Sequence, residues 1–451
     1  MTAGGGMRVA VCKRAATPLR ALLLAAVALL PLACATPGER FATVDSALTR
    51  DGPEAALSRA ESLARGGGNA ALDHLHAGML LHMAGDFEAS NERLEAAARR
   101  MDADDPFSLT EGLAAVTIAE GVGAFVGQPH ERVALHVIRA FNFMAQQQWD
   151  AARVEARQID LRLNALAGRS GFYRDDAFAR YVTGLIYEEL GEIDDARIAY
   201  RKAYRAYDEQ RETTGVPVPR PLQQALLRLT ADAAFADEHA ALRTVFATTP
   251  EPAGRGEGGR AIVILGHGLA PRIREISVNA QHPQTGRLYR VAVPAYGDSR
   301  QPLRDARVTS GGYEVRAEVV QDIDRLARES LSERMPGILA RAATRVAAKN
   351  QMVGQARDQN PVLGVLVNLF TFASERVDDR AWTTLPGQYL LAEVPVDDDP
   401  ATIALELRGP GGRVWREQIT DVRVEPGQTR FVFAHALSPH VPLHRPVAGE
   451  G

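Results

Sequence analysis

The spacing of apolar residues divides the chain into a helical half and a half that is rich in strands. From Phe41 to about Thr249, apolar residues recur with the 3.6-residue period of amphipathic helices, and Ala, Leu, Arg and Glu dominate. Beyond Arg260, short runs of β-branched and aromatic residues take over, and many of them alternate in polarity. The pattern predicts an α+β fold, all-α at the N-terminal side and β-rich at the C-terminal end.

An internal repeat is sharpest between Asp176 and Tyr207, where small and aromatic residues recur at fixed spacing. The positions are Gly184, Leu185, Tyr187, Gly191, Ala196, Tyr200 and Ala203. This spacing resembles the tetratricopeptide repeat (TPR), a pair of helices in which small residues allow close approach and larger ones fill the gap. Two weaker copies, at 78–97 and 140–156, precede it at irregular intervals. We therefore expect degenerate TPR-like hairpins within residues 34–249.

Stacked hairpins of this kind form an extended concave surface that can bind a peptide or a partner protein. The predicted groove positions lie on the first helix of two hairpins: Phe141, Met144, Tyr181 and Glu188. The alternative is that these side chains belong to the core and that the hairpins serve only as a scaffold.

A Pro- and Gly-rich stretch, residues 250–260, predicts a linker between the helical part and an α+β domain at 261–440. Within that domain, helices are expected at 319–332 and 338–357, and the apolar segment 361–373 is either a buried helix or a membrane-contacting segment. The tail, 441–451, is expected to be disordered. The predicted strands are 261–265, 287–293, 388–395, 402–408, 414–419 and 429–435, the last four forming an antiparallel sheet.

The N-terminus has the three zones of a secretion signal: a basic head, the apolar run 21–30, and a small-residue exit before Cys34. The exit, Leu30-Pro31-Leu32-Ala33-Cys34, resembles the bacterial lipobox, with Pro31 where the family prefers Leu. This resemblance implies removal of residues 1–33 and attachment of a lipid, including palmitate, to Cys34. An ordinary secretory signal with an incidental cysteine is the alternative. By the same resemblance, Ala35 favours the outer membrane.

Charge and cysteine usage narrow the functional classes. Residues 1–33 hold four basic and no acidic residues, so the formal charge of -4 becomes -8 in the mature chain. An acidic chain argues against a nucleic-acid surface, which needs clustered cations. The second cysteine, Cys12, lies within the signal, so the mature chain can form no intrachain disulfide.

Motifs of the common catalytic and metal sites do not occur. The chain contains no Gly-x-Ser-x-Gly elbow, no HExxH and no phosphate-binding GxxxxGKS loop. His74, His76 and His82 crowd one hairpin, but none are three or four residues apart, so we interpret them as solvated or core residues. We expect no catalytic residue, no metal and no cofactor.

Three segments resemble a family of poorly characterised bacterial TPR lipoproteins: 268–271, 341–349 and 375–386. The most specific stretch contains Asp379, Arg380, Trp382 and Pro386. It is either a structural corner, in which Trp382 packs and Asp379 or Arg380 forms an ion pair, or a binding surface. The resemblance implies a role in the cell envelope and no defined reaction.

These observations predict a noncatalytic, lipid-anchored adaptor on the periplasmic face of the outer membrane, which binds an envelope protein through the TPR-like groove. The alternative is an envelope enzyme acting on peptidoglycan, with its site between the two halves.

Overall fold

The computed structural model describes residues 36–65, 70–104, 124–167, 173–247, 249, 258–281, 288–300, 303–359, 377–397 and 400–437. The predicted signal 1–33, the lipid-bearing Cys34, the segment 361–373 and the tail 441–451 lie outside these ranges, as does most of the predicted linker. Residues Pro37–Gly451 form one compact unit, so the division into two domains stays a prediction.

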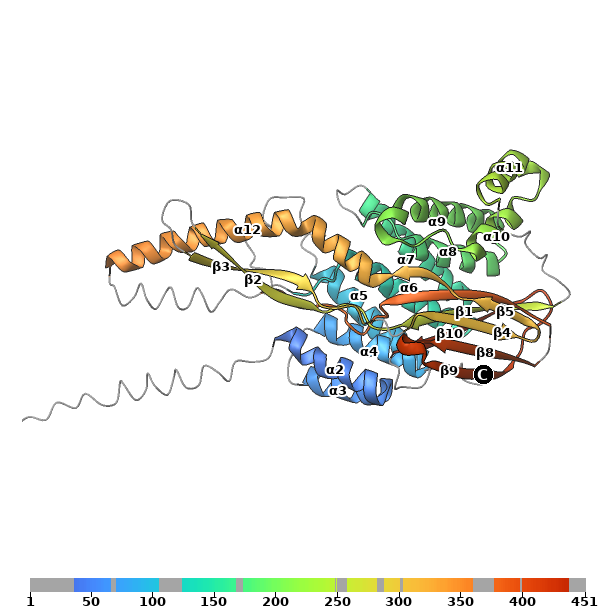
Figure 1. Ribbon diagram of the computed structural model, residues 1–451, viewed down its shortest axis with the longest axis horizontal. Coiled ribbons are helices and arrows are strands. Elements are labelled where there is room, and N and C mark those ends of the chain that lie inside the picture. The colour runs from blue at the N-terminus through green and yellow to red at the C-terminus, as the bar shows by residue number, and fades with distance from the viewer. Residues whose placement is uncertain are drawn as a thin grey trace, which may run out of the picture. The chain divides into compact units, whose positions relative to one another are not determined.

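Helices make up the first part of this unit, and most of them pair into antiparallel hairpins (Figure 1). In chain order they are α2 (Pro37–Asp51), α3 (Pro53–Arg65), α4 (Ala70–Ala84), α5 (Phe87–Ala103), α6 (Pro129–Ala145), α7 (Trp149–Ala167), α8 (Ala177–Glu189), α9 (Ile193–Thr214), α10 (Arg220–Leu229), the short 3-10 helix η2 (Ala233–Phe235) and α11 (Ala236–Val245).

The small residues of the repeat pattern lie where two helices of a hairpin touch. A Cβ added at Gly184 would collide with the Tyr200 ring, and one at Gly78 would lie 2.6 Å from Leu94. Gly191 ends the first helix of its hairpin with a φ of 73°, a conformation that glycine adopts at little cost. The prediction of TPR-like hairpins is confirmed.

The strands form two four-stranded sheets and one two-stranded ribbon. Their bounds are β1 (Gly259–His267), β2 (Ile273–Gln281), β3 (Leu288–Tyr296), β4 (Asp305–Ser310), β5 (Tyr313–Arg316), β6 (Glu318–Asp322), β7 (Gln388–Val396), β8 (Ala401–Arg408), β9 (Val414–Val422) and β10 (Thr429–Ala436), with a 3-10 turn η3 (Pro410–Gly412) before β9. The inner sheet has the order β10-β1-β7-β6, the outer sheet the order β5-β4-β8-β9, and β2 pairs with β3.

The prediction of one antiparallel sheet from the last four strands was wrong. β7 and β10 belong to the inner sheet, whereas β8 and β9 belong to the outer sheet. β10 runs parallel to β1, while β7 runs antiparallel to it. Alternation of polarity shows which face of a strand is buried, but it does not select the neighbouring strand.

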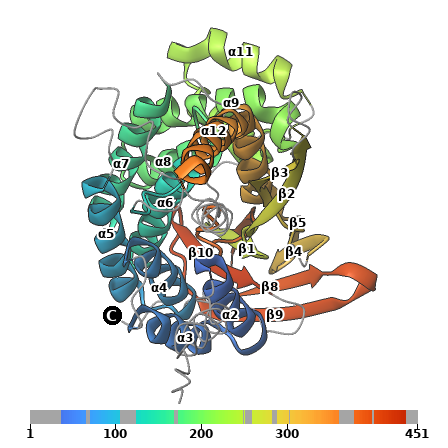
Figure 2. The same cartoon turned by 90° about the vertical axis from the view of Figure 1, so that its left-hand side faces the viewer.

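The inner sheet is buried on both faces. On β1, Ala261, Val263 and Leu265 pack against the outer sheet, while Ile262 and Ile264 pack against the helices. A strand between two apolar layers needs a continuous apolar run, and this explains the sequence Ala-Ile-Val-Ile-Leu. Figure 2 shows α4, α6 and α8 on the side of β10 and β1, with α5 and α7 outside them. The layers are thus helices, inner sheet and outer sheet.

One long helix, α12 (Ile323–Gln359), follows β6 and runs along the β2–β3 ribbon (Figure 1). Two helices had been predicted here. The first predicted helix, 319–332, overlaps β6, because Val319 and its neighbours pair with β7. Pro336, which follows the first predicted helix, lies inside α12. A proline removes one helical hydrogen bond and strains the helix locally, but it does not always end it.

Candidate functional site

The four predicted groove residues lie at the interface between the helices and the inner sheet. Phe141, Met144, Tyr181 and Glu188 are 0%, 2%, 0% and 3% exposed. The ring centroids of Phe141 and of Phe433 in β10 lie 4.9 Å apart. The prediction that these residues line an open groove is therefore corrected: the concave surface exists, but the chain's own sheet covers it. The second face of the inner sheet needs an apolar partner, and the helices supply it.

Glu188 is the one charged residue among these four, and two arginines surround its carboxylate. Arg228 of α10 lies 2.8 Å from it and Arg260 of β1 3.1 Å, and the Tyr200 hydroxyl donates to it at 2.7 Å. Arg260 also pairs with Glu393 of β7 at 2.9 Å. Burial acts to raise the pKa of Glu188, but the two guanidinium groups outweigh it and lower this pKa to about 2. The network joins α8, α10 and the inner sheet.

The strap, which we define as residues 377–387, leads directly into β7. It contains the motif residues singled out in the sequence. Trp382 is fully buried, and Arg380 pairs with Asp378 at 2.6 Å. A Cβ at Gly38 of α2 would lie 2.6 Å from Asp379, and one at Gly266 of β1 would lie 2.8 Å from Pro386. The strap is therefore packed between α2 and β1, as expected of a structural corner.

Two helix residues hold the strap, and neither was predicted to do so: Asp45 did not stand out in the sequence, and His76 was interpreted there as a solvated or core residue. Asp45 of α2 is 1% exposed and accepts a hydrogen bond from the Thr383 hydroxyl at 2.9 Å. The same carboxylate receives Arg272 at 2.7 Å and Arg300 at 2.8 Å. His76 of α4 is hydrogen-bonded to Thr384 at 3.0 Å. No local sequence pattern indicates this role of Asp45 or His76, because their partners lie 227 to 338 residues further along the chain.

Glu131 of α6 makes a third contact with the strap. In this case the local sequence contains a recognisable motif, a helix capping box. Gln128, Pro129 and Glu131 form a capping box, in which Glu131 accepts a hydrogen bond from the Gln128 backbone N–H at 2.7 Å. Its other oxygen accepts one from the Trp382 N–H, also at 2.7 Å. Burial raises the pKa of Glu131 to about 7.

Several histidines are buried at the same interface. Burial lowers the pKa of His76, His82 and His267 to about 4 and that of His130 to about 3. His82 shares a hydrogen bond of 2.6 Å with Asn142, and its ring lies edge-on to His435 at 5.1 Å. At neutral pH these imidazoles are uncharged, so they act as compact polar core residues.

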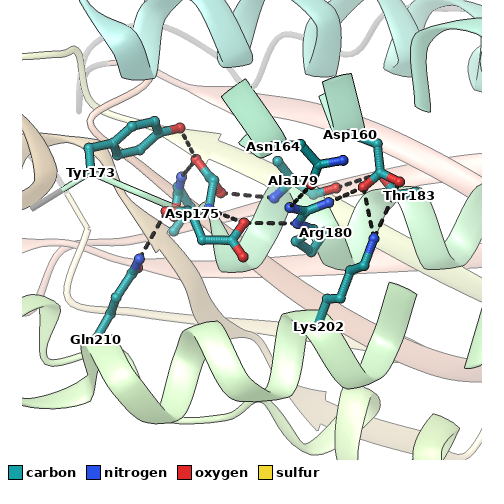
Figure 3. A network of polar contacts seen from close by, with 11 residues as sticks. Asp160, Asn164, Tyr173, Asp175, Ala179, Arg180, Thr183, Lys202 and Gln210 are labelled. Carbon is teal, nitrogen blue, oxygen red and sulfur yellow. Dashed lines mark hydrogen bonds and ion pairs between the residues drawn. The ribbon is translucent and has the colours of Figure 1, made fainter. Parts of the chain in front are cut away.

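A second charged network lies where the three helices α7, α8 and α9 meet (Figure 3). Arg180 of α8 pairs with Asp160 of α7 and, at 2.8 Å, with Asp175. Lys202 of α9 reaches Asp160 at 3.4 Å. Burial raises the pKa of Asp175 to about 6 and lowers that of Arg180 to about 10. These ion pairs hold the three helices in register.

Beside this network lies a cavity between α6, α8 and β7, whose empty space of about 330 Å³ includes solvent at its mouth. Its polar lining consists of His130, Asp176, Gln321 and Tyr389. Asp176 already accepts hydrogen bonds from the Tyr173 hydroxyl at 2.6 Å, from Gln321 at 2.9 Å and from a backbone N–H. Such a fully bonded carboxylate is poorly placed to act as a general base.

The residues that the structure describes contain neither a candidate metal cluster nor a candidate membrane span. Among them, no group of three or more His, Cys, Asp or Glu side chains is arranged to hold a metal ion. In the same part of the chain, no helix combines the length and apolarity needed to span a bilayer.

Comparisons with known proteins add little. No protein-family model and no curated protein match the chain. Among solved structures, "MamA 41-end from Desulfovibrio magneticus RS-1" is 15% identical and covers 47% of this chain and 90% of its own, with a TM-score of 0.31. The structure "Crystal structure of MamA" is also 15% identical and covers 47% and 92%, with a TM-score of 0.30. A superposition this loose carries no argument about function.

Proposed function

We propose that the protein is a noncatalytic scaffold, lipid-anchored through Cys34 on the periplasmic face of the outer membrane, which binds an envelope protein. The lipobox-like sequence before Cys34 and the hairpin stack support this proposal. The partner surface differs from the one expected from the sequence. Because the inner sheet covers the concave side, the outer faces of the hairpins are the surface left for a partner.

The observation that carries the proposal is an apolar stripe on the outer face of α7. Val154 is 53% exposed and Leu161 is 62% exposed. They lie seven residues apart, so both project from the same side of the helix, with exposed Arg157 between them. On the neighbouring helix α9, Ile198 is 45% exposed. Exposed apolar side chains grouped among polar ones are typical of protein-binding surfaces.

A rigid support favours this surface. Arg153 of α7 pairs with Glu192, at the start of α9, at 2.6 Å, and Lys202 pairs with Asp160. These contacts fix α7 against α9, so the stripe is presented with little loss of conformational entropy on binding.

The test is crosslinking in intact cells followed by affinity capture from membranes. Wild-type protein is expected to fractionate with membranes, to carry acyl chains on Cys34 and to recover a defined envelope protein. A Cys34→Ser variant is expected in the soluble fraction. A Val154→Asp, Leu161→Asp double variant should stay on the membrane but recover at least about tenfold less partner, since two desolvated apolar contacts are each worth about 1 kcal/mol or more.

The matched control is Val245→Asp on α11, which also changes an exposed apolar residue, 61% exposed, far along the chain from the stripe. This variant should recover the partner as wild type does. Equal recovery by the double variant would remove the α7 surface from the proposal, and a mature chain without acyl groups would remove the anchor.

A further inference from the structure

Glu131 occupies a joint at which several parts of the chain meet. It lies near the start of α6 and is 3% exposed. One carboxylate oxygen receives the backbone N–H of Gln128, and the other receives that of Trp382 in the strap, each at 2.7 Å. A single side chain thus ties the first turn of α6 to a segment about 250 residues further along the chain.

The charged and titratable side chains that face Glu131 do little to stabilise a negative charge on its carboxylate. On its own helix, His130 is kept uncharged by burial, and Arg132 pairs with Asp102 of α5 at 2.6 Å. In the strap, the negative charge of Asp378 repels a negative charge on Glu131 and so acts to raise the pKa of Glu131.

The remaining neighbours belong to α12 and β3. Arg334 of α12 acts to lower the pKa of Glu131 through space, but the side chain of this arginine is exposed. Among the described residues, none forms an ion pair with Glu131. From β3, Tyr296 stays neutral, since burial raises its pKa. The two N–H groups that donate to Glu131 are uncharged backbone groups; they act to lower its pKa, but burial outweighs them, whereas Glu188 has two arginines.

We propose that Glu131 is a proton-sensitive joint between α6 and the strap, which is closed while its carboxyl is protonated and loosens when the carboxyl ionises. A neutral carboxyl is cheap to bury and still accepts a hydrogen bond. An ionised carboxylate without a counterion is costly to bury, and it gains by reaching water, which requires the strap to move away from α6.

The direction of the effect follows from linkage. Burial raises the pKa of Glu131 from 4.5 to about 7. The group therefore contributes stability that is fully present below about pH 4.5 and is lost as the pH rises through about 7. Loosening is expected on the alkaline side. Because the strap also binds Asp45 and His76, a change at Glu131 would reach α2 and α4.

Trp382 provides a direct reporter, since its own N–H donates to Glu131. The chain has three tryptophans, so a Trp149→Phe, Trp415→Phe background leaves Trp382 as the single one. In the purified full-length protein, we expect the emission of Trp382 to shift to longer wavelength with a midpoint between about pH 6 and pH 8. Glu131→Gln in this background should abolish the transition. An unchanged transition in Glu131→Gln, or none in the background protein, would overturn the proposal.

Two further variants keep the test decisive. Asp175→Asn removes another carboxyl with a raised pKa, in the network around Arg180, and should leave the transition in place. Asp378→Asn removes the negative charge facing Glu131 and should move the midpoint to lower pH, even if Glu131→Gln fails to fold. Loss of the transition in Asp175→Asn, or an unmoved midpoint in Asp378→Asn, would contradict the assignment to Glu131.

Discussion

Two glutamates on the inner side of the helices, Glu131 and Glu188, are equally buried at 3% exposed and yet have opposite electrostatics. The pKa of Glu188 falls to about 2, because two arginines outweigh the effect of burial. The pKa of Glu131 rises to about 7, because burial outweighs the two backbone N–H groups that act to lower it. Burial alone therefore does not decide the charge of a carboxyl in this interface; the presence of a counterion does.

The difference separates two kinds of contact between helices and sheet. The Glu188 network holds its charges in place, and removing one partner leaves another buried without compensation. The contact of Glu131 with the strap depends on protonation. One interface thus contains a permanent attachment and a conditional one.

Removing apolar packing between the helices and the inner sheet should have the largest effect. Phe141 contacts Phe178, Tyr389 and Phe433, so Phe141→Ala should lower the free energy of unfolding by about 4 kcal/mol. Urea denaturation measures this. Leu161→Ala, at an exposed position on α7, is the control and should change stability by less than about 0.5 kcal/mol. A cost below about 1 kcal/mol for Phe141→Ala would mean that the concave side is an open groove after all.

Breaking the permanent attachment should come next. Arg260→Met leaves Glu188 with Arg228 and removes the cation from Glu393, so we expect a loss of about 3 kcal/mol in the free energy of unfolding. Arg416→Met is the control, because this side chain is 73% exposed on the outer sheet and its removal should leave the urea midpoint unchanged. Similar losses in both variants would show that the Glu188 network is not a buried one.

The pH dependence of the free energy of unfolding should distinguish Glu131 from Glu188, with a smaller effect than the two substitutions above. Relative to wild type, Glu131→Gln should gain about 2 kcal/mol between pH 5 and pH 8, because it lacks a carboxyl whose ionisation destabilises the folded state. Glu188→Gln should show no gain over this range. Glu188 contributes stability above about pH 4.5 that is lost as the pH falls through about 2.

The measurement is the free energy of unfolding in urea at each pH, expressed as the difference between variant and wild type. This difference removes the contribution of the buried histidines, which all the proteins share. Those histidines, with pKa values of about 4, destabilise every variant alike as the pH falls below about 6.5. Parallel pH profiles for Glu131→Gln and Glu188→Gln would erase the distinction between the two glutamates.

Elements whose signals are local could be predicted from the amino-acid sequence. The helical period predicted the hairpins, and the repeat pattern predicted that Gly184 allows close approach of two helices and that the large Tyr200 ring fills the gap between them. The run 261–265 predicted a strand, and its lack of alternation is typical of burial on both faces. The capping box at Glu131 was also present in the local sequence.

What covers each of these surfaces could be seen only in the folded chain. Periodicity marks Phe141 and Tyr181 as residues of an apolar face, but a face that binds a partner and a face that binds the chain's own sheet have the same pattern. Likewise, nothing near Glu131 in the sequence indicates that the Trp382 N–H reaches it, or that it lacks the arginines that Glu188 has. Hydrophobic burial has no direction and ion pairs act through space, so contacts between distant segments leave little trace in either local sequence.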